Sequence, residues 1–224
     1  RCTARQLGRL RQRRAVSTQI SSHTYDLAPQ QIAESRIAIR EQHPKASSWK
    51  LTKWKVVGPF HNLERAGFAE KFPPEDNVKL DATYTGKEAE VAWQPLSTPD
   101  PYGKVDLNKP YGKLKEVTAY AYPEFESAKA QEVELRLGCK NAWKIWLNGE
   151  LVFGRDEYHR GQRIDQYKMP VEFQKGPNSI LLKLCQNEQK QDWTVQWEFQ
   201  LRVCDSTGTA ILATNRSDTN SPRE

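Results

Sequence analysis

The sequence predicts an all-β protein folded as a two-sheet antiparallel sandwich. Short runs of alternating apolar and polar residues recur from residue 54 to residue 203, and turn residues separate them. Seven Trp, eight Tyr and seven Phe accompany 13 Pro and 12 Gly. Aromatic residues favour strands, whereas Pro and Gly favour turns. Because no helical period follows residue 50, about eight strands at this spacing indicate two packed antiparallel sheets.

The beginning of the sequence follows a different pattern. Pro29 is followed by QQIAESRIAIREQH, in which apolar residues recur at helical spacing. We expect a short helix that ends before Pro44, because the residue before a proline disfavours helix. The expected organisation is a basic, partly helical linker or extension over residues 1–48, a β-sandwich over residues 49–212 and a disordered tail over residues 213–224.

The net charge of +6 originates in the first 16 residues, which contain six Arg and no Asp or Glu. The remainder has 28 Lys plus Arg against 28 Asp plus Glu. An arginine cluster can bind phosphates or acidic lipid, but it also fits a solvated linker. Nucleic-acid binding through this segment therefore ranks last among the functions considered, and the sandwich itself is expected to have no nucleic-acid partner.

The sequence does not predict a membrane span. No stretch approaches the ~18 consecutive apolar residues that a membrane-spanning helix needs. Because the sequence begins at Arg1 without an initiator Met or an apolar signal region, we expect a fragment of a longer precursor. Localisation is therefore an indirect inference.

The four cysteines, Cys2, Cys139, Cys185 and Cys204, are widely spaced and include no C-x-x-C pair. This spacing does not favour a structural zinc site. Cys139 and Cys185 each end an expected strand, where a disulfide and two free buried thiols are both compatible with the pattern. The disulfide state of this pair stays open.

The expected strands follow one another with turns or loops between them. In order, they are residues 54–60, 91–96, 117–122, 133–139, 143–147, 150–153, 169–173, 180–184 and 195–203. Within the run 54–60, the strand itself is expected to stop at the Gly58-Pro59 break. Residues 61–82 and 97–114 are polar or rich in Pro and Gly, so we expect long loops there.

A two-residue turn, Asn148-Gly149, gives the clearest local signal. Asn-Gly between apolar strand formers is typical of a type I′ hairpin, because both central residues need positive φ. The expected cross-strand pairs are Leu147 with Glu150, Trp146 with Leu151, and Ile145 with Val152. Apolar side chains then occupy both faces of the hairpin, so one face must be covered by something other than the core.

The last two turns and strands agree with the sandwich. Residues 175–178, Lys-Gly-Pro-Asn, separate two alternating segments and predict a hairpin or a tight turn between sheets. In the final strand, apolar residues from Val195 to Val203 alternate with Gln196, Glu198, Gln200 and Arg202. This strand is expected to have one face in the core and one in water.

Several of these segments together resemble a known family. KIWLNG at 144–149, VEF at 171–173 and KGPNSILLKL at 175–184 look like the W-x-N-G … L-x-x-G-x-N-x-L-x-x-K signature of galactose-binding-like jelly rolls. That family includes the sugar-binding domains of β-galactosidase-type hydrolases. The flanks KVVGPF at 55–60 and WEFQLRVCDSTG at 197–208 resemble those of accessory domains in large secreted bacterial proteins.

The resemblance covers about residues 49–212 and implies a jelly-roll sandwich. It also implies a non-catalytic accessory module of a larger exported protein, secreted, periplasmic or at the cell surface, which binds carbohydrate weakly. The matching residues form turns and fill a core, so they specify architecture and say little about function. The alternative is a structural or protein-interaction sandwich without a small-molecule ligand, whose aromatic face packs on neighbouring domains. The exposure of Trp143, Trp146 and Tyr158 would separate the two.

The candidate ligand-binding residues lie in the loop after the Asn-Gly hairpin. Tyr158 could stack on a sugar ring while Asp156, Arg160 or Asp165 binds its hydroxyl groups. Trp143 is a further candidate for an exposed stacking platform, with Trp193 and Tyr120. The other interpretation is a solvated loop held by its own arginine and acid pairs.

No cofactor or catalytic site is expected. Asp156, Glu157 and Asp165 could hold a structural Ca²⁺ together with backbone carbonyls, although their spacing does not favour it. The sequence contains no H-E-x-x-H, G-x-S-x-G, phosphate-loop or dinucleotide motif. Asp156 and Glu157 are adjacent, so on an extended chain their side chains point apart and cannot flank a glycosidic bond.

Overall fold

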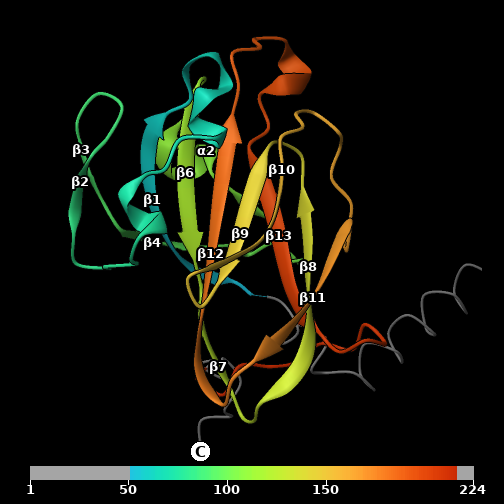
Figure 1. The fold of residues 1–224 in the computed structure, drawn as a ribbon. Coiled ribbons are helices and arrows are strands. Elements are labelled where there is room, and N and C mark those ends of the chain that lie inside the picture. The colour runs from blue at the N-terminus through green and yellow to red at the C-terminus, as the bar shows by residue number, and fades with distance from the viewer. Residues whose placement is uncertain (1–50, 216–224) are drawn as a thin grey trace, which may run out of the picture. The chain divides into compact units, whose positions relative to one another are not determined.

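The computed structural model describes residues 51–215 and confirms an all-β, antiparallel jelly-roll sandwich (Figure 1). The strands are β1 (Lys53–His61), β2 (Thr83–Thr85), β3 (Glu90–Ala92), β4 (Gln94–Ser97), β5 (Val105–Asp106), β6 (Val117–Tyr122), β7 (Glu124–Ser127), β8 (Gln131–Cys139), β9 (Trp143–Leu147), β10 (Glu150–Arg155), β11 (Tyr167–Phe173), β12 (Gly176–Gln186) and β13 (Glu198–Cys204). The helices are short: η1 (Leu63–Phe68), η2 (Pro73–Glu75), α2 (Asn108–Tyr111) and η3 (Asp192–Thr194). The expected N-terminal helix, the arginine segment and most of the expected tail lie outside the described residues.

The strands form two main sheets. The larger has the order β10-β9-β12-β6-β1-β4, with β7 paired to the other end of β12. The smaller has the order β11-β8-β13-β5, and β2 with β3 makes a separate two-stranded ribbon. β11 and β12 belong to different sheets, so the chain passes between the sheets as expected. The connection is only Gln174-Lys175, however, because Gly176, Pro177 and Asn178 already belong to β12 and pair with β7. Among residues 51–215, no helix is long and apolar enough to span a bilayer.

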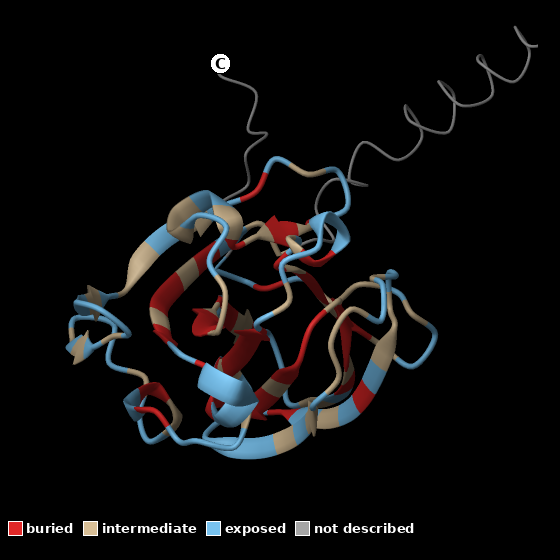
Figure 2. Ribbon diagram, turned by 90° about the horizontal axis from the view of Figure 1, so that it is seen from above, coloured by how far each residue is buried: buried red, intermediate tan, exposed pale blue. Residues whose placement is uncertain are grey.

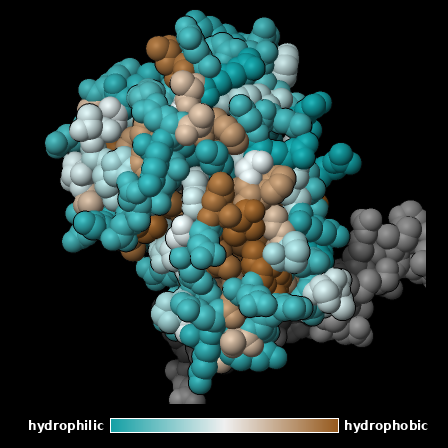
Figure 3. All heavy atoms as spheres, in the orientation of Figure 1, coloured by the Kyte–Doolittle hydropathy of each residue, from teal (hydrophilic) through white to brown (hydrophobic). Residues whose placement is uncertain are grey.

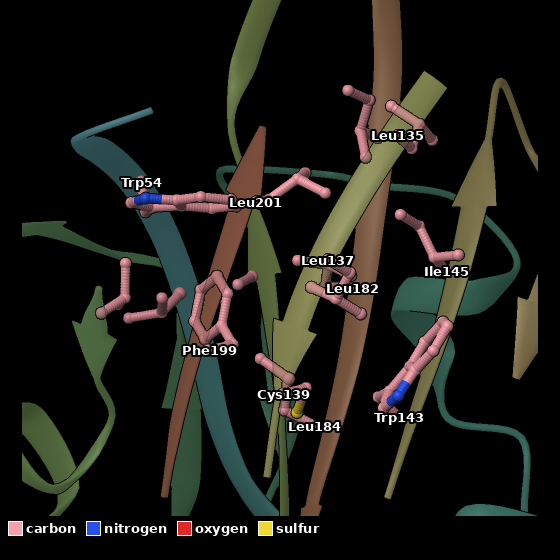
Figure 4. Close-up of a cluster of buried hydrophobic side chains, with 14 of the residues drawn as sticks. Trp54, Leu135, Leu137, Cys139, Trp143, Ile145, Leu182, Leu184, Phe199 and Leu201 are labelled. Atoms are coloured by element: carbon pink, nitrogen blue, oxygen red, sulfur yellow. The ribbon is translucent and has the colours of Figure 1, made fainter. Parts of the chain in front are cut away.

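The main core fills the space between the two sheets. Figure 2 shows the buried residues on the strands at the centre and the exposed ones on the surrounding loops. In Figure 4, Trp54 of β1 lies beside Phe199 of β13, whose ring centroid is 4.8 Å away at an interplanar angle of 87°. Leu137 of β8 and Leu182 of β12 meet in the middle of this core. Alternating apolar residues thus point inward from both sheets, as the strand pattern predicts.

A second apolar cluster covers the outer face of the larger sheet. Its buried members are Val57, Phe60, Phe72, Tyr120, Trp146 and Leu181. Phe72 comes from the connection between β1 and β4, whose residues Val78, Tyr84, Val91 and Trp93 also pack on the cluster. The prediction that one face of the Asn-Gly hairpin needs its own cover is therefore confirmed, and residues 62–93 form that cover.

A buried ion pair fastens this cover to the sheet. The side chain of Lys183 on β12 is fully buried, and its Nζ lies 2.7 Å from Glu75 Oε1 of η2. The Tyr120 hydroxyl donates to the same carboxylate oxygen. Burial lowers the pKa of Lys183, and Glu75 opposes that shift. Because both charged groups are removed from water, each is stabilised by the opposite charge of the other.

The structure corrects two details of strand geometry. Asn148 and Gly149 have φ values of 52° and 85°, as a type I′ turn requires. Beyond Leu151, however, the register shifts and Phe153 rather than Val152 pairs with Ile145. β1 also continues through Gly58-Pro59 to His61 instead of stopping there, with its own register shift after Val57. Both irregularities are β-bulges, which alternation cannot reveal.

The cysteines within residues 51–215 are free and buried. Cys139 packs in the main core (Figure 4), whereas Cys185 accepts a hydrogen bond from Thr118 Oγ1 at 3.5 Å. Cys185 directly follows Leu184, which faces the main core, so Cys185 points to the opposite face of its sheet. Burial raises the pKa of Cys139 to about 12 and that of Cys185 to about 11. The free-thiol alternative is confirmed for this pair.

Candidate functional site

A groove lies on the outer face of the smaller sheet. On β13, Phe199 and Leu201 face the core, so Glu198 and Gln200 face outward. The groove has a volume of about 380 Å³. It is lined by Asp100, Tyr102, Lys104, Lys140, Gly161, Gln162, Ile164, Gln196, Glu198 and Gln200.

One wall of the groove is the loop between β4 and β5. Asp100 Oδ1 accepts hydrogen bonds from the backbone N–H groups of Tyr102 at 2.8 Å and Lys104 at 3.0 Å. Thr98 Oγ1 donates to the Lys104 carbonyl at 2.5 Å. Gln200 Nε2 donates to the Tyr102 carbonyl and so ties the loop to the floor. The ring of Tyr102 is left 57% exposed on a loop with a fixed backbone.

The opposite wall is the loop of residues 156–166, which crosses the outer face of β8. Gly138 permits this crossing, because a Cβ at that position would lie 2.4 Å from the Arg163 carbonyl oxygen. Asp165 holds the loop down by accepting hydrogen bonds from Arg136 Nη1 at 3.0 Å and Arg202 Nη1 at 2.7 Å. Ile164, 48% exposed, presents an apolar side chain to the groove from this wall.

The floor is polar and its charges are balanced. Lys140 Nζ donates to Gln196 Oε1 at 2.5 Å, and Lys104 Nζ lies 3.1 Å from Glu198 Oε2. Gln162 Oε1 is buried and has no hydrogen-bond partner among residues 51–215. A buried acceptor of this kind gains stability when a ligand donates to it. Apolar walls above a floor of amides and charged groups suit a small polar ligand with apolar faces.

The sequence-predicted residue Tyr158 lies outside this groove. Its hydroxyl accepts a hydrogen bond from Asn62 Nδ2 at 3.0 Å, and the Arg65 guanidinium carbon lies 5.3 Å from its ring centroid. Burial raises the pKa of Tyr158 above its ordinary value. One side of the ring is therefore occupied by Arg65, which joins this loop to η1.

The predicted polar ligands are dispersed rather than gathered. Asp156 and Arg160 are exposed and do not line the groove. Glu157 lies 2.8 Å from Arg155 Nη2 and 3.3 Å from Arg160 Nε, and hydrogen bonding by Arg155 lowers the pKa of Glu157. Asp165 is held by two arginines beneath the loop. Glu157 thus pairs with arginines next to it in the sequence, whereas Asp165 pairs with Arg136 of β8 and Arg202 of β13.

The three acids considered for Ca²⁺ are not assembled into a cation site. Glu157 and Asp165 are each neutralised by arginine. Within residues 51–215, no group of three or more His, Cys, Asp or Glu side chains is placed to hold a metal ion.

The structure removes Trp143 from the candidate ligand-binding residues. Trp143 is 0% exposed and packs in the main core, and Tyr120 is equally buried in the second cluster. Trp146 lies beneath the 62–93 cover. Trp193 alone of the proposed aromatic platforms is open, at 57% exposure. Alternation could not orient Trp143, because side chains on both faces of β9 are buried.

Gln196, just before β13, and Glu198 and Gln200 on β13 showed a sequence pattern that relates to the groove. Gln196, Glu198 and Gln200 were expected on a face in water, and they form the floor of the groove. Tyr102 and Lys140 gave no local signal, because they reach the groove only through the order of the strands.

Comparisons with known proteins give limited similarity. No protein-family model matches the sequence, and no curated protein matches it. Among solved structures, a β-glucosidase from Kluyveromyces marxianus is 10% identical, with a TM-score of 0.41. The match covers 68% of this chain and 16% of the β-glucosidase chain. A GH31 α-xylosidase from Xanthomonas citri is 9% identical, with a TM-score of 0.33, covering 70% of this chain and 16% of its own.

A β-glucuronidase from Faecalibacterium prausnitzii is 16% identical, with a TM-score of 0.32, covering 63% of this chain and 23% of its own. The matched part therefore corresponds to less than a quarter of the length of each of these chains. The fold described here, an antiparallel β-sandwich with a groove on its smaller sheet, rests on the strand pairing itself.

Proposed function

We propose that this chain is a non-catalytic module that binds a carbohydrate in the groove on its smaller sheet. The observation that carries the proposal is the pairing of two exposed apolar side chains, Tyr102 and Ile164, with a hydrogen-bonding floor. Sugars have apolar ring faces and a rim of hydroxyl groups, so they need both kinds of contact at once. The groove volume of about 380 Å³ lies within the roughly 300–1,000 Å³ range of small-molecule sites.

The charge balance of the groove favours an uncharged sugar. Its two carboxylates, Asp100 and Glu198, are matched by the ammonium groups of Lys104 and Lys140. The groove therefore has no net charge from these four groups, and the expected ligand is also neutral. We expect the affinity for such a sugar to change little with ionic strength.

The same contacts argue against turnover in the groove. Asp100 Oδ1 accepts two backbone hydrogen bonds within its loop, and Glu198 pairs with Lys104. A glycosidase needs two carboxyl groups with separate acid and base roles on either side of the scissile bond. We therefore propose an accessory, non-catalytic role for residues 49–212. The resemblance to accessory jelly-roll domains supports a larger exported parent, in the secreted, periplasmic or cell-surface space.

A glycan-array screen of the full chain tests this proposal, followed by calorimetric titration of any glycan that binds. Tyr102→Ala should reduce the affinity at least tenfold, because a stacking surface is lost. Phe153→Ala is the matched control, since Phe153 is similarly exposed but lies on β10. The proposal would be contradicted by silence on every glycan, or by equal affinities for wild type and Tyr102→Ala.

A second candidate function is a protein-interaction domain without a small-molecule ligand. Leu151 and Phe153, 57% and 47% exposed, lie on the edge strand β10. Figure 3 shows apolar side chains gathered over the middle of the face on which β9, β10 and β11 lie. Exposed apolar surface on an edge strand is typical of interaction sites. If Tyr102→Ala has no effect while Leu151→Ser with Phe153→Ser abolishes association with a neighbouring domain, this alternative replaces the first.

A further inference from the structure

We infer that the ligand of the groove is an oligosaccharide, whose chain continues from the groove past Lys140 onto the exposed indole of Trp193. The inference rests on the proposed carbohydrate binding and extends it from a single sugar unit to a chain. It also gives a role to the exposed ring of Trp193, which does not line the groove.

Trp193 is exposed, yet the loop that carries it is fixed. It lies in η3, where the fully buried Thr194 places its Oγ1 2.7 Å from the carbonyl oxygens of both Gln189 and Gln191. Lys115 Nζ donates to the Thr194 carbonyl at 2.9 Å. A ring that is exposed but held in place loses little conformational freedom when a ligand stacks on it.

His159 supports the indole from one side. The two ring centroids are 5.2 Å apart at an interplanar angle of 83°, an edge-to-face arrangement. His159 Nε2 lies 2.9 Å from Asn187 Oδ1, which fixes the imidazole. Burial lowers the pKa of His159, which favours the uncharged imidazole.

Lys140 joins this aromatic pair to the groove. Its Nζ donates to the Trp193 carbonyl at 2.9 Å and to Gln196 Oε1 at 2.5 Å, and both Lys140 and Gln196 line the groove. The Lys140 carbonyl also accepts a hydrogen bond from the Arg160 N–H at 3.2 Å, next to His159 in sequence. The floor of the groove and the backbone of the Trp193 loop are thus connected through the Lys140 side chain. From this connection we take the exposed Trp193 ring as the second stacking surface.

The test is the dependence of affinity on chain length. Glucose, galactose and mannose and their linear tetrasaccharides are titrated calorimetrically into wild type, Trp193→Ala and Tyr102→Ala, each as the full chain. Wild type should bind one tetrasaccharide about tenfold more tightly than the matching monosaccharide, because a second ring is buried. Trp193→Ala should remove that difference and leave monosaccharide affinity unchanged, whereas Tyr102→Ala should weaken both ligands.

The outcomes separate this inference from the proposed function. If Trp193→Ala still prefers the tetrasaccharide, the inference is wrong and the proposed carbohydrate binding stands. The same holds if Trp193→Ala weakens the affinity for monosaccharide and tetrasaccharide equally. Failure of wild type to bind any of these sugars overturns the inference, and silence on the whole glycan array overturns carbohydrate binding with it. Trp193 is exposed, so unchanged thermal unfolding of Trp193→Ala shows that the variant is folded.

Discussion

Replacing Glu75 by Ala should destabilise the protein strongly, because it leaves a buried lysine without its counter-ion. The Lys183 side chain is 0% exposed and that of Glu75 is 8% exposed, so water does not screen the pair. Removing one partner of a buried pair costs about 3–5 kcal/mol of unfolding free energy. The same change also deprives the Tyr120 hydroxyl of its acceptor. A loss of this size is a large fraction of the ~5–15 kcal/mol that stabilises a typical domain.

Urea denaturation followed by tryptophan fluorescence measures this effect. The control is Glu75→Gln combined with Lys183→Met, which removes both charges and keeps similar volumes. Replacing a buried pair by neutral groups is often close to neutral, so the double variant should be much more stable than Glu75→Ala. If Glu75→Ala costs less than about 1 kcal/mol, or if the double variant is equally destabilised, the 62–93 cover does not depend on the ion pair.

Three further predictions concern the groove, the buried tyrosines and the thiols. Gly138→Ala should displace the loop of residues 156–166, because the added Cβ would lie 2.4 Å from the Arg163 carbonyl oxygen. We expect the unfolding free energy, measured by urea titration, to fall by about 1–3 kcal/mol, and ligand binding to be lost. Burial raises the folded-state pKa of Tyr111 and Tyr120. Above pH ~10 the unfolded tyrosines lose protons that the folded ones keep, so their contribution to stability should fall as pH rises, and denaturation at stepped alkaline pH checks this. Cys139 and Cys185 should react with a thiol reagent only after denaturation, because they are buried and their pKa values are raised; rapid labelling of the native protein would contradict their placement.

Local sequence patterns predicted most of the longer strands, because alternation and turn residues depend on neighbouring positions in the sequence. The Asn148-Gly149 turn requires positive φ, and the structure has it at both positions. The apolar period of β13 is the inward face of the smaller sheet. The bulge after Leu151 was not predictable, because it depends on how β10 pairs with β9 rather than on alternation.

The candidate site was harder to predict because it is made by segments distant in sequence. Tyr102 meets Gln200 only because β5 pairs with β13 at the edge of the smaller sheet. The loop of residues 156–166 borders the groove, but Gly161, Gln162 and Ile164 line it rather than Tyr158. The reason is tertiary: Arg65 of η1 lies over the ring of Tyr158.

The most direct test of the central claim is a titration of the isotopically labelled protein with a glycan that binds, followed by amide chemical-shift mapping. If the glycan binds in the groove, the largest shifts fall on both walls and the floor, at Tyr102, Gln162, Gln196 and Gln200. Shifts confined to Asp156–Arg160 or to β10, with these four amides unchanged, would show that the glycan binds elsewhere.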